Sequence, residues 1–186
     1  MRAFVIAFVS VLAMASATAQ AAPPRPTSRI DALLRAIDVV PASRAELERQ
    51  VPNAQAELLA VAQDGARDTW SRLRAIAFLS FYPDATTKAA LLGLARAAKS
   101  DADIRGGAIY SFGRTFGSAG EPAVADVVAD VAERDADASV REQAVRALRW
   151  VDAPAAAARL TRIGTTRPEL AGLAKMTAER RAKRMR

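Results

Sequence analysis

The feature that most constrains the fold of this chain is a six-residue segment that recurs three times with one spacing of residue types. Each copy reads apolar-Arg-x-x-Ala-apolar. The copies are Leu73–Phe78, Ile104–Ile109 and Val140–Val145. Their arginines, Arg74, Arg105 and Arg141, lie 31 and then 36 residues apart. Self-similarity at such a period is typical of stacked supersecondary units rather than of a single globular core.

The chain around these copies alternates between two kinds of predicted helix, one rich in Ala, Leu and Val and the other carrying the motif. The first kind is expected at about 53–63, 85–98, 121–134 and 154–163, and the second at about 69–81, 102–115, 139–150 and from 168 onward. Turn residues such as Asp64-Gly65 separate them. Hydrophobic residues make up 51% of the chain and aromatic residues only 5%, a composition that favours closely packed helices over a sheet. The sequence therefore predicts an all-α chain of about four helix hairpins.

Two further helices are expected before the repeats, over residues 28–51. Ser28 is suited to N-cap a helix with an apolar stripe, and Pro41 ends that helix. A second, more polar helix is predicted from about Ser43 to Gln50. We expect these helices to cap the repeat domain of residues 52–174, because a stack of repeats needs a polar end to remain in solution.

The first 21 residues have the pattern of a secretory signal. Arg2 precedes the apolar run Ala3 to Met14, and small residues lead to Ala19-Gln20-Ala21. The run is shorter than the about 20 apolar residues that span a bilayer, and residues 22–27 form a Pro-rich spacer. The chain has no cysteine, which excludes disulfides and thiolate metal sites. These features predict a periplasmic or secreted protein that is cleaved near Ala21.

Positive charge is concentrated at the C-terminus. Six of the 27 basic residues lie within residues 175–186, whereas residues 22–174 carry 20 basic and 19 acidic residues. A nucleic-acid-binding domain would need a basic stripe on its folded part. The sequence therefore predicts no nucleic-acid partner and a basic C-terminal tail at residues 175–186, which could contact a membrane surface peripherally.

The second and third motif copies resemble the Asp-x-x-Val-Arg signature of HEAT and HEAT-like repeats, including those of the phycobilisome-lyase type. They read Asp101-Ala-Asp-Ile-Arg105 and Asp137-Ala-Ser-Val-Arg141. The resemblance covers residues 53 to 166 and implies an α-solenoid with N-terminal capping helices. A tetratricopeptide array would instead keep a strict 34-residue period. The first copy departs from the signature, since Trp70 takes the place of the Asp.

In that family, the Asp and Arg of successive repeats form a structural ladder. The residues here would be Asp101, Arg105, Asp137, Arg141 and Arg74. An Asp at a helix start accepts backbone N–H bonds, and the Arg of the next repeat can reach its other oxygen. The fourth copy has Ala171 in place of the Arg, so the ladder should be incomplete at both ends.

Catalysis is not expected. The chain has no histidine, the commonest general acid-base and zinc ligand. Acidic residues gather at Asp126, Asp130 and Glu133, but this spacing is typical of a solvated helix face opposite a valine stripe. Some HEAT-like proteins attach bilins to antenna proteins, a substrate that an exported protein would not meet. We therefore expect no enzyme activity, no metal and no cofactor.

The candidate binding residues are arginines and aromatic residues near the ends of the motif helices. They are Tyr82, Tyr110, Arg114, Arg146, Arg149 and Trp150. The resemblance implies that the motif helices line a concave face, so these side chains would form one strip along it. Arg, Tyr and Trp dominate binding hot spots. Tyr82 and Trp150 could instead be core residues that close their hairpins. Gly106-Gly107 within a motif helix indicates either close helix packing or a notch for a partner backbone.

These observations predict an exported, non-catalytic protein–protein interaction module, a scaffold that binds another protein with an acidic surface on its concave face. The alternative is an adaptor at the envelope surface whose basic tail binds an anionic membrane or an acidic partner. An enzyme of unknown type is a third reading. The sequence leaves the partner's identity and the oligomeric state open.

Overall fold

The computed structural model describes residues 28–36, 38 and 40–186, which form ten α-helices and four short 3-10 helices. No β-strand occurs in this part of the chain, so the prediction of an all-α fold is confirmed there. The predicted signal at 1–21 and the Pro-rich spacer at 22–27 lie outside the described residues.

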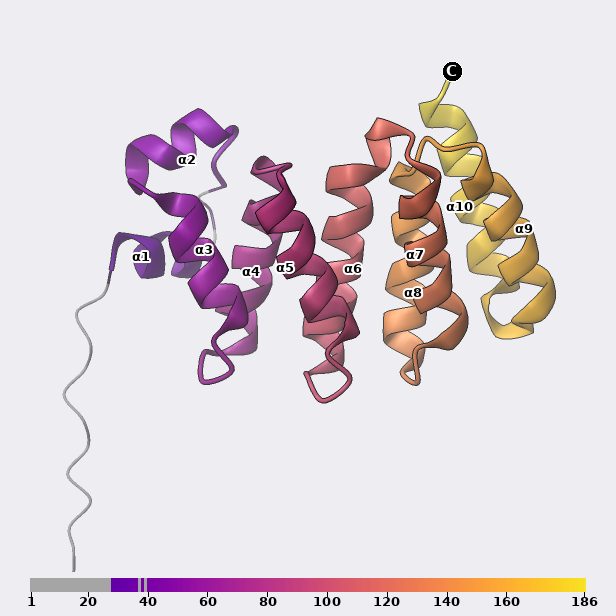
Figure 1. Cartoon of the computed structure of the whole chain (residues 1–186), viewed down its shortest axis with the longest axis horizontal. Coiled ribbons are helices and arrows are strands. Elements are labelled where there is room, and N and C mark those ends of the chain that lie inside the picture. Colours follow the sequence, from indigo (N-terminus) through magenta and orange to yellow (C-terminus); the bar gives the residue numbers. More distant parts are fainter. Residues whose placement is uncertain (1–27, 37, 39) are drawn as a thin grey trace, which may run out of the picture.

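The first two helices lie at one end of the molecule (Figure 1). Helix α1 (Arg29–Arg35) begins at Ser28, whose hydroxyl accepts the N–H of Asp31 in a capping box. Helix α2 (Arg44–Gln50) begins at Ser43, whose hydroxyl accepts the N–H of Glu46. Apolar side chains of both helices are buried, and α1 packs against α3 and α4. The N-cap predicted at Ser28 is therefore present, and the second helix begins at Ser43 as expected.

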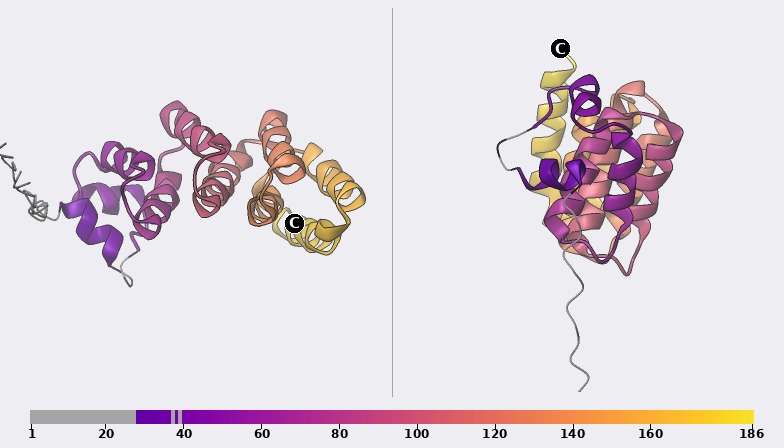
Figure 2. Two further views of the ribbon diagram at one scale, coloured as in Figure 1. Left: turned by 90° about the horizontal axis from the view of Figure 1, so that it is seen from below. Right: turned by 90° about the vertical axis from the view of Figure 1, so that its left-hand side faces the viewer.

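The remaining eight helices form four pairs, in which each helix packs against its neighbour in the chain. The first helices of the pairs are α3 (Ala54–Gln63), α5 (Ala85–Arg96), α7 (Pro122–Arg134) and α9 (Ala155–Thr166). The second helices are α4 (Thr69–Phe78), α6 (Ala102–Phe116), α8 (Ala138–Ala147) and α10 (Ala171–Arg184). The pairs follow one another along the long axis of the molecule (Figures 1 and 2). Helices α4, α6, α8 and α10 also pack against one another in that order.

Short 3-10 helices continue three of the second helices. They are η1 (Leu79–Phe81) after α4, η2 (Gly117–Ala119) after α6 and η3 (Leu148–Trp150) after α8, and a fourth, η4 (Pro168–Leu170), precedes α10. A 3-10 turn has about 3.0 residues per turn instead of 3.6. Side chains on η1 and η3 therefore point in other directions than they would if the preceding α-helix continued. This difference affects which residues reach the candidate site.

Glycine allows the second helices to approach closely. A Cβ added to Gly107 would lie 2.6 Å from a Leu73 methyl group on α4, and one added to Gly113 would lie 2.9 Å from Ala147 on α8. Real Cβ atoms essentially never come that close. Of the two interpretations of the Gly106-Gly107 pair, close helix packing is therefore the one that the structure supports at Gly107.

The C-terminal residues form a packed helix, which corrects the prediction of a basic tail at 175–186. Helix α10 begins at Ala171 and ends at Arg184, and it packs against α9 and α8. Its buried face carries Ala174, Thr177 and Arg181. The charge count alone could not reveal this, because Arg181 is a basic residue that points inward and bonds to main-chain carbonyls.

None of the helices in the described part of the chain is both long enough and apolar enough to cross a membrane.

Candidate binding site

Trp150 lies at the centre of the candidate site. It is the last residue of η3, and its side chain is half-buried. Its indole Nε1–H donates a 3.1 Å hydrogen bond to the hydroxyl of Tyr110 on α6. The bond joins η3 to α6 and fixes the orientation of the indole ring.

Three arginines from three different elements surround this ring. The guanidinium carbons of Arg149, Arg184 and Arg114 lie 4.2, 5.7 and 5.9 Å from the ring centroid. These distances are within the range of cation–π attraction, which contributes about 0.5–1 kcal/mol per pair at exposed sites. The site thus combines the end of α6, η3 and the last turn of α10.

The last two turns of α10 are held against the chain that follows η3. Arg181 is buried, and its Nε donates to the carbonyl of Val151 at 2.8 Å, while its Nη2 donates to the carbonyls of Asp152 and Ala153 at 3.0 Å each. Arg184 donates to the carbonyl of Arg149 at 3.1 Å and forms an ion pair with Asp152. The main chain of residues 151–153 therefore holds α10 in place through these hydrogen bonds.

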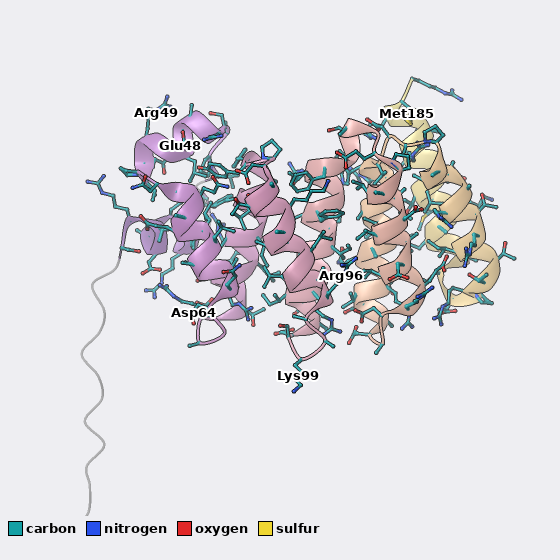
Figure 3. The ribbon with its side chains drawn as sticks, in the orientation of Figure 1. Glu48, Arg49, Asp64, Arg96, Lys99 and Met185 are labelled. Carbon is teal, nitrogen blue, oxygen red and sulfur yellow. The ribbon has the colours of Figure 1, made fainter. Side chains whose placement is uncertain are left out.

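A hollow of about 380 Å³ opens between η3 and α10, lined by Arg149, Trp150, Arg180, Lys183 and Arg184. We call the hollow and its neighbours the Trp150 surface. It consists of Tyr110, Arg114, Arg149, Trp150, Arg180, Lys183 and Arg184. Met185, exposed beside it, marks this end of α10 in Figure 3.

The Trp150 surface carries a large excess of positive charge. Five of its seven side chains are cationic, and Asp152 is the one acidic side chain that contacts them within the described residues. Since Asp152 is paired with Arg184, four cations have no acidic neighbour in contact. Such a surface attracts anionic groups and repels cationic ones.

Four of the six predicted strip residues come together here. Tyr110, Arg114, Arg149 and Trp150 are all part of the Trp150 surface. Arg146 lies one turn earlier on α8, where it forms a 2.9 Å ion pair with Glu142. It is therefore paired within its own helix rather than turned to the indole ring.

Tyr82 does not belong to the strip, and that part of the prediction is wrong. Its side chain is fully buried, with the guanidinium of Arg44 4.8 Å from its ring centroid. Burial raises the pKa of its hydroxyl, and the nearby carboxylate of Glu48 raises it further. The prediction placed Tyr82 by counting residues from the motif arginine. Helix α4 ends two residues sooner after its motif arginine than α8 does, so the same count does not give equivalent positions in the two helices. Tyr82 therefore corresponds to Val151, and both are buried residues that follow a 3-10 turn.

The two predicted ladder aspartates are N-caps, as expected. Asp101 accepts the N–H of Asp103 at 2.9 Å, and Asp137 accepts the N–H of Ser139 at 2.8 Å. Hydrogen bonds from Ser139 hold the pKa of Asp137 below its ordinary value. The other oxygen of Asp101 accepts the hydroxyl of Thr69 on the preceding second helix, at 3.2 Å.

The ladder arginines bond to partners other than the predicted cap aspartates. Arg105 is buried and donates to the carbonyl of Ser100 at 2.5 Å and to the carboxylate of Asp135, with Nη2 3.1 Å from Oδ1. Arg141 donates to the carbonyls of Asp135 and Ala136 at 2.9 and 3.0 Å. Arg105 therefore ties the loop before α6 to the loop before α8, and its acidic partner lies two residues before the cap. Arg141 bonds to the loop before its own helix, and its acidic partner is Glu169 at 3.8 Å.

The first motif arginine joins the repeats to the N-terminal helices. Arg74 donates to the carbonyl of Leu33 on α1 at 3.4 Å. Its guanidinium carbon also lies 5.9 Å from the ring centroid of Trp70 and 5.3 Å from that of Phe78. Trp70 itself is exposed, at 55% of its possible surface.

Sequence reasoning missed that α10 contributes to the strip. Arg180, Lys183 and Arg184 were counted as tail charges and were not placed beside Trp150. A signal was present, because Met176, Arg180 and Lys183 are spaced by four and three residues and so share one side of a helix. Extending the helix expected from 168 onward through the segment assigned to the tail would have joined the two sets of residues.

A larger groove of about 980 Å³ runs between α3 and α5. Gly93 lines it, and a Cβ added there would meet no atom within 4 Å. The other lining side chains are of mixed character, including Leu59, Thr86 and Asp101. Three of its lining side chains are basic and one is acidic, but Arg67 is paired with Asp31 and Arg72 donates to the carbonyl of Ala62. Among the described residues, no aromatic ring lines this groove.

The acidic cluster predicted to be a solvated face forms ion pairs. Asp126 pairs with Arg159 at 2.6 Å, and Glu133 pairs with Arg162 at 3.2 Å, both across to α9. No group of three or more His, Cys, Asp or Glu side chains in the described residues is arranged to hold a metal ion.

Comparisons of this chain with models of protein families, with curated proteins and with solved structures find no match.

Proposed function

We propose that this chain is a non-catalytic protein-interaction module, a HEAT-like α-solenoid that binds a partner protein through the face formed by its second helices. The observation that carries the proposal is the Trp150 surface, where α6, η3 and α10 bring together a tryptophan and four cations that contact no acidic side chain among the described residues. Its residue types are those that dominate binding hot spots.

The solenoid part of the proposal rests on repetition. Each of the four helix pairs packs against the next through its second helix. The motif arginines Arg105 and Arg141 occupy the same position in successive pairs and bond to the loops in the same way. Nearest-neighbour stacking of equivalent units is the defining property of a solenoid. The buried Leu33, Leu34 and Leu47 of α1 and α2 suit helices that cap such a stack.

The site is ordered before any partner arrives. The indole ring is held by Tyr110, and α10 is held by the three carbonyl bonds of Arg181. A partner would therefore lose little free energy in ordering these side chains, and such losses are about 0.5–1.5 kcal/mol for each mobile side chain. This pre-ordering favours a specific interface over a non-specific charged patch.

Membrane binding through the C-terminal segment is the competing function. Arg181 points into the protein and Arg184 is paired with Asp152. Two of the six basic residues of the C-terminal segment are therefore not free to bind lipid headgroups. The large apolar side chains that α10 and its end expose are Met176 and Met185. An interfacial helix usually buries a wider apolar face in the lipid.

The same proposal places the protein in a bacterial periplasm or outside the cell, on the signal-like pattern of Arg2, the apolar run that follows and Ala19-Gln20-Ala21. Mass spectrometry of the protein recovered from a periplasmic fraction should give a chain that begins near residue 22. Recovery of the full-length chain from the cytoplasm would contradict this placement.

The binding function is tested by two charge reversals that differ only in position. Arg149→Glu changes the Trp150 surface, whereas Arg96→Glu changes an exposed cation on α5, away from the Met185 end of α10 in Figure 3. Each purified variant is used to capture proteins from an envelope extract, with folding checked by circular dichroism. We expect a partner held by the unchanged chain to be retained by Arg96→Glu and lost with Arg149→Glu. Equal retention by both variants would refute binding at this face.

A further inference from the structure

We infer that the Trp150 surface binds an extended acidic peptide segment, whose Asp or Glu carboxylates lie against the cations while neighbouring atoms rest on the exposed edge of the indole ring. This inference rests on the proposed function and adds the chemistry of the partner. A segment with several carboxylates fits better than a single anion or a lipid surface, for three reasons.

The first reason is the number and spacing of the charges. Arg149 and Arg184 both lie within 6 Å of one ring centroid, so their charges are at most about 10 Å apart, close to the Debye length of ~8 Å at physiological ionic strength. Like charges at this range repel each other, and an acidic ligand removes that repulsion. One carboxylate would balance only one of the four cations that contact no acidic side chain in the described part of the chain.

The second reason is the match to an extended backbone. Residues i and i+2 of an extended chain point to the same side about 6.4–6.8 Å apart. This spacing lies within the range of separations that the ring contacts allow between Arg149, Arg184 and Arg114. Alternate acidic residues of one short segment can therefore meet successive cations, and a guanidinium can bind each carboxylate through two N–H groups.

The third reason is the shape of the site. Trp150 is half-buried and borders a hollow of about 380 Å³. A side chain can enter such a hollow, whereas a flat bilayer would meet the rim. The rim is formed by Arg180 and Lys183, which are exposed on one side of α10. Lys183 and Arg180 are thus placed to guide an acidic segment toward the indole ring.

The test uses a fluorescein-labelled peptide of four Glu-Ser repeats and a control peptide of four Gln-Ser repeats, with binding followed by fluorescence anisotropy. We expect saturable binding of the Glu peptide, at least about tenfold weaker binding of the Gln peptide, and loss of affinity as salt is raised. Vesicles containing phosphatidylglycerol and inorganic phosphate are tested as competitors. The inference is overturned if the vesicles bind the chain while the Glu peptide does not, or if phosphate alone displaces the peptide at equal charge concentration.

Two double variants with the same loss of charge locate the binding. Arg149→Gln with Lys183→Gln removes two cations from the Trp150 surface, whereas Arg96→Gln with Lys99→Gln removes two exposed cations near the opposite edge (Figure 3). We expect about tenfold weaker peptide binding in the first variant and less than twofold in the second. Equal losses would show diffuse attraction by net charge and overturn the site. If the peptide binds at the Trp150 surface but no protein is captured through it, the proposed function fails while this inference stands.

Discussion

Replacing Arg181 with alanine should destabilise the protein far more than replacing its neighbour Arg180. Arg181 is 8% exposed and donates to three main-chain carbonyls at 2.8–3.0 Å. Removing it breaks three charge-assisted hydrogen bonds, each worth about 1.5–3 kcal/mol. Water can reach some of the three carbonyls, and its hydrogen bonds to them would recover part of this free energy. We therefore expect a loss of about 3–5 kcal/mol in the free energy of unfolding. The exposed Arg180 should cost less than about 0.5 kcal/mol.

The assay is urea denaturation followed by circular dichroism, combined with amide hydrogen exchange across residues 171–184. A stack of helix pairs can open from its end, so exchange in α10 should rise before the rest of the molecule unfolds. Arg180→Ala is the matched control, because it removes the same side chain from the adjacent residue of the same helix. The reasoning is refuted if both variants unfold at the same urea concentration and α10 exchanges equally in both.

Three further results are expected. Arg105→Ala should lower the free energy of unfolding by about 2–4 kcal/mol, because it removes the cation paired with Asp135, leaving that carboxylate only the N–H of Asp137 within the described part of the chain, and removes the donor to the Ser100 carbonyl. The exposed Arg134→Ala should cost under about 0.5 kcal/mol in the same urea titration. Gly93→Ala should raise the melting temperature, since the new Cβ meets no atom and alanine favours a helix interior by about 0.5–1 kcal/mol; a lower melting temperature would contradict the helical environment described for this residue. The N–H of Thr87 donates to Asp84 and holds the pKa of this carboxyl below its ordinary 3.8. The stability that the carboxylate contributes is therefore complete above pH 3.8 and is lost as the pH falls through the lower pKa of the folded state. Asp84→Asn should flatten the decline in melting temperature below about pH 4, and an unchanged slope would count against this hydrogen bond.

Most helices could be predicted from the sequence because local signals agree with the fold. The expected helices at 53–63 and 102–115 are α3 at Ala54–Gln63 and α6 at Ala102–Phe116. Their starts and ends are set by caps and turn residues that act within a few positions. The Asp caps at 101 and 137 were predictable for the same reason.

The errors lie where distant parts of the chain decide the outcome. Tyr82 was misplaced because η1 begins two residues sooner after its motif arginine than η3 does, and a shift of two residues moves a side chain from the surface to the core. The partner of Arg105 was misassigned because the carboxylate that it reaches is on the next loop, at Asp135. The burial of Arg181 on α10 was missed because a buried arginine has no distinct sequence signal, whereas the spacing of Met176, Arg180 and Lys183 did indicate a helix.

The most direct test of the account uses the two tryptophans of the chain, Trp70 and Trp150, as internal reporters. Each indole N–H gives one cross-peak in a nitrogen-15 correlation spectrum, and Trp70→Phe assigns them. On titration with the Glu-Ser peptide, we expect the Trp150 cross-peak to shift saturably, since its N–H bonds to Tyr110 within the proposed site, while the exposed Trp70 cross-peak stays in place. A shift of the Trp70 cross-peak alone, or no shift of either during binding, would contradict the claim that the Trp150 surface is the binding site.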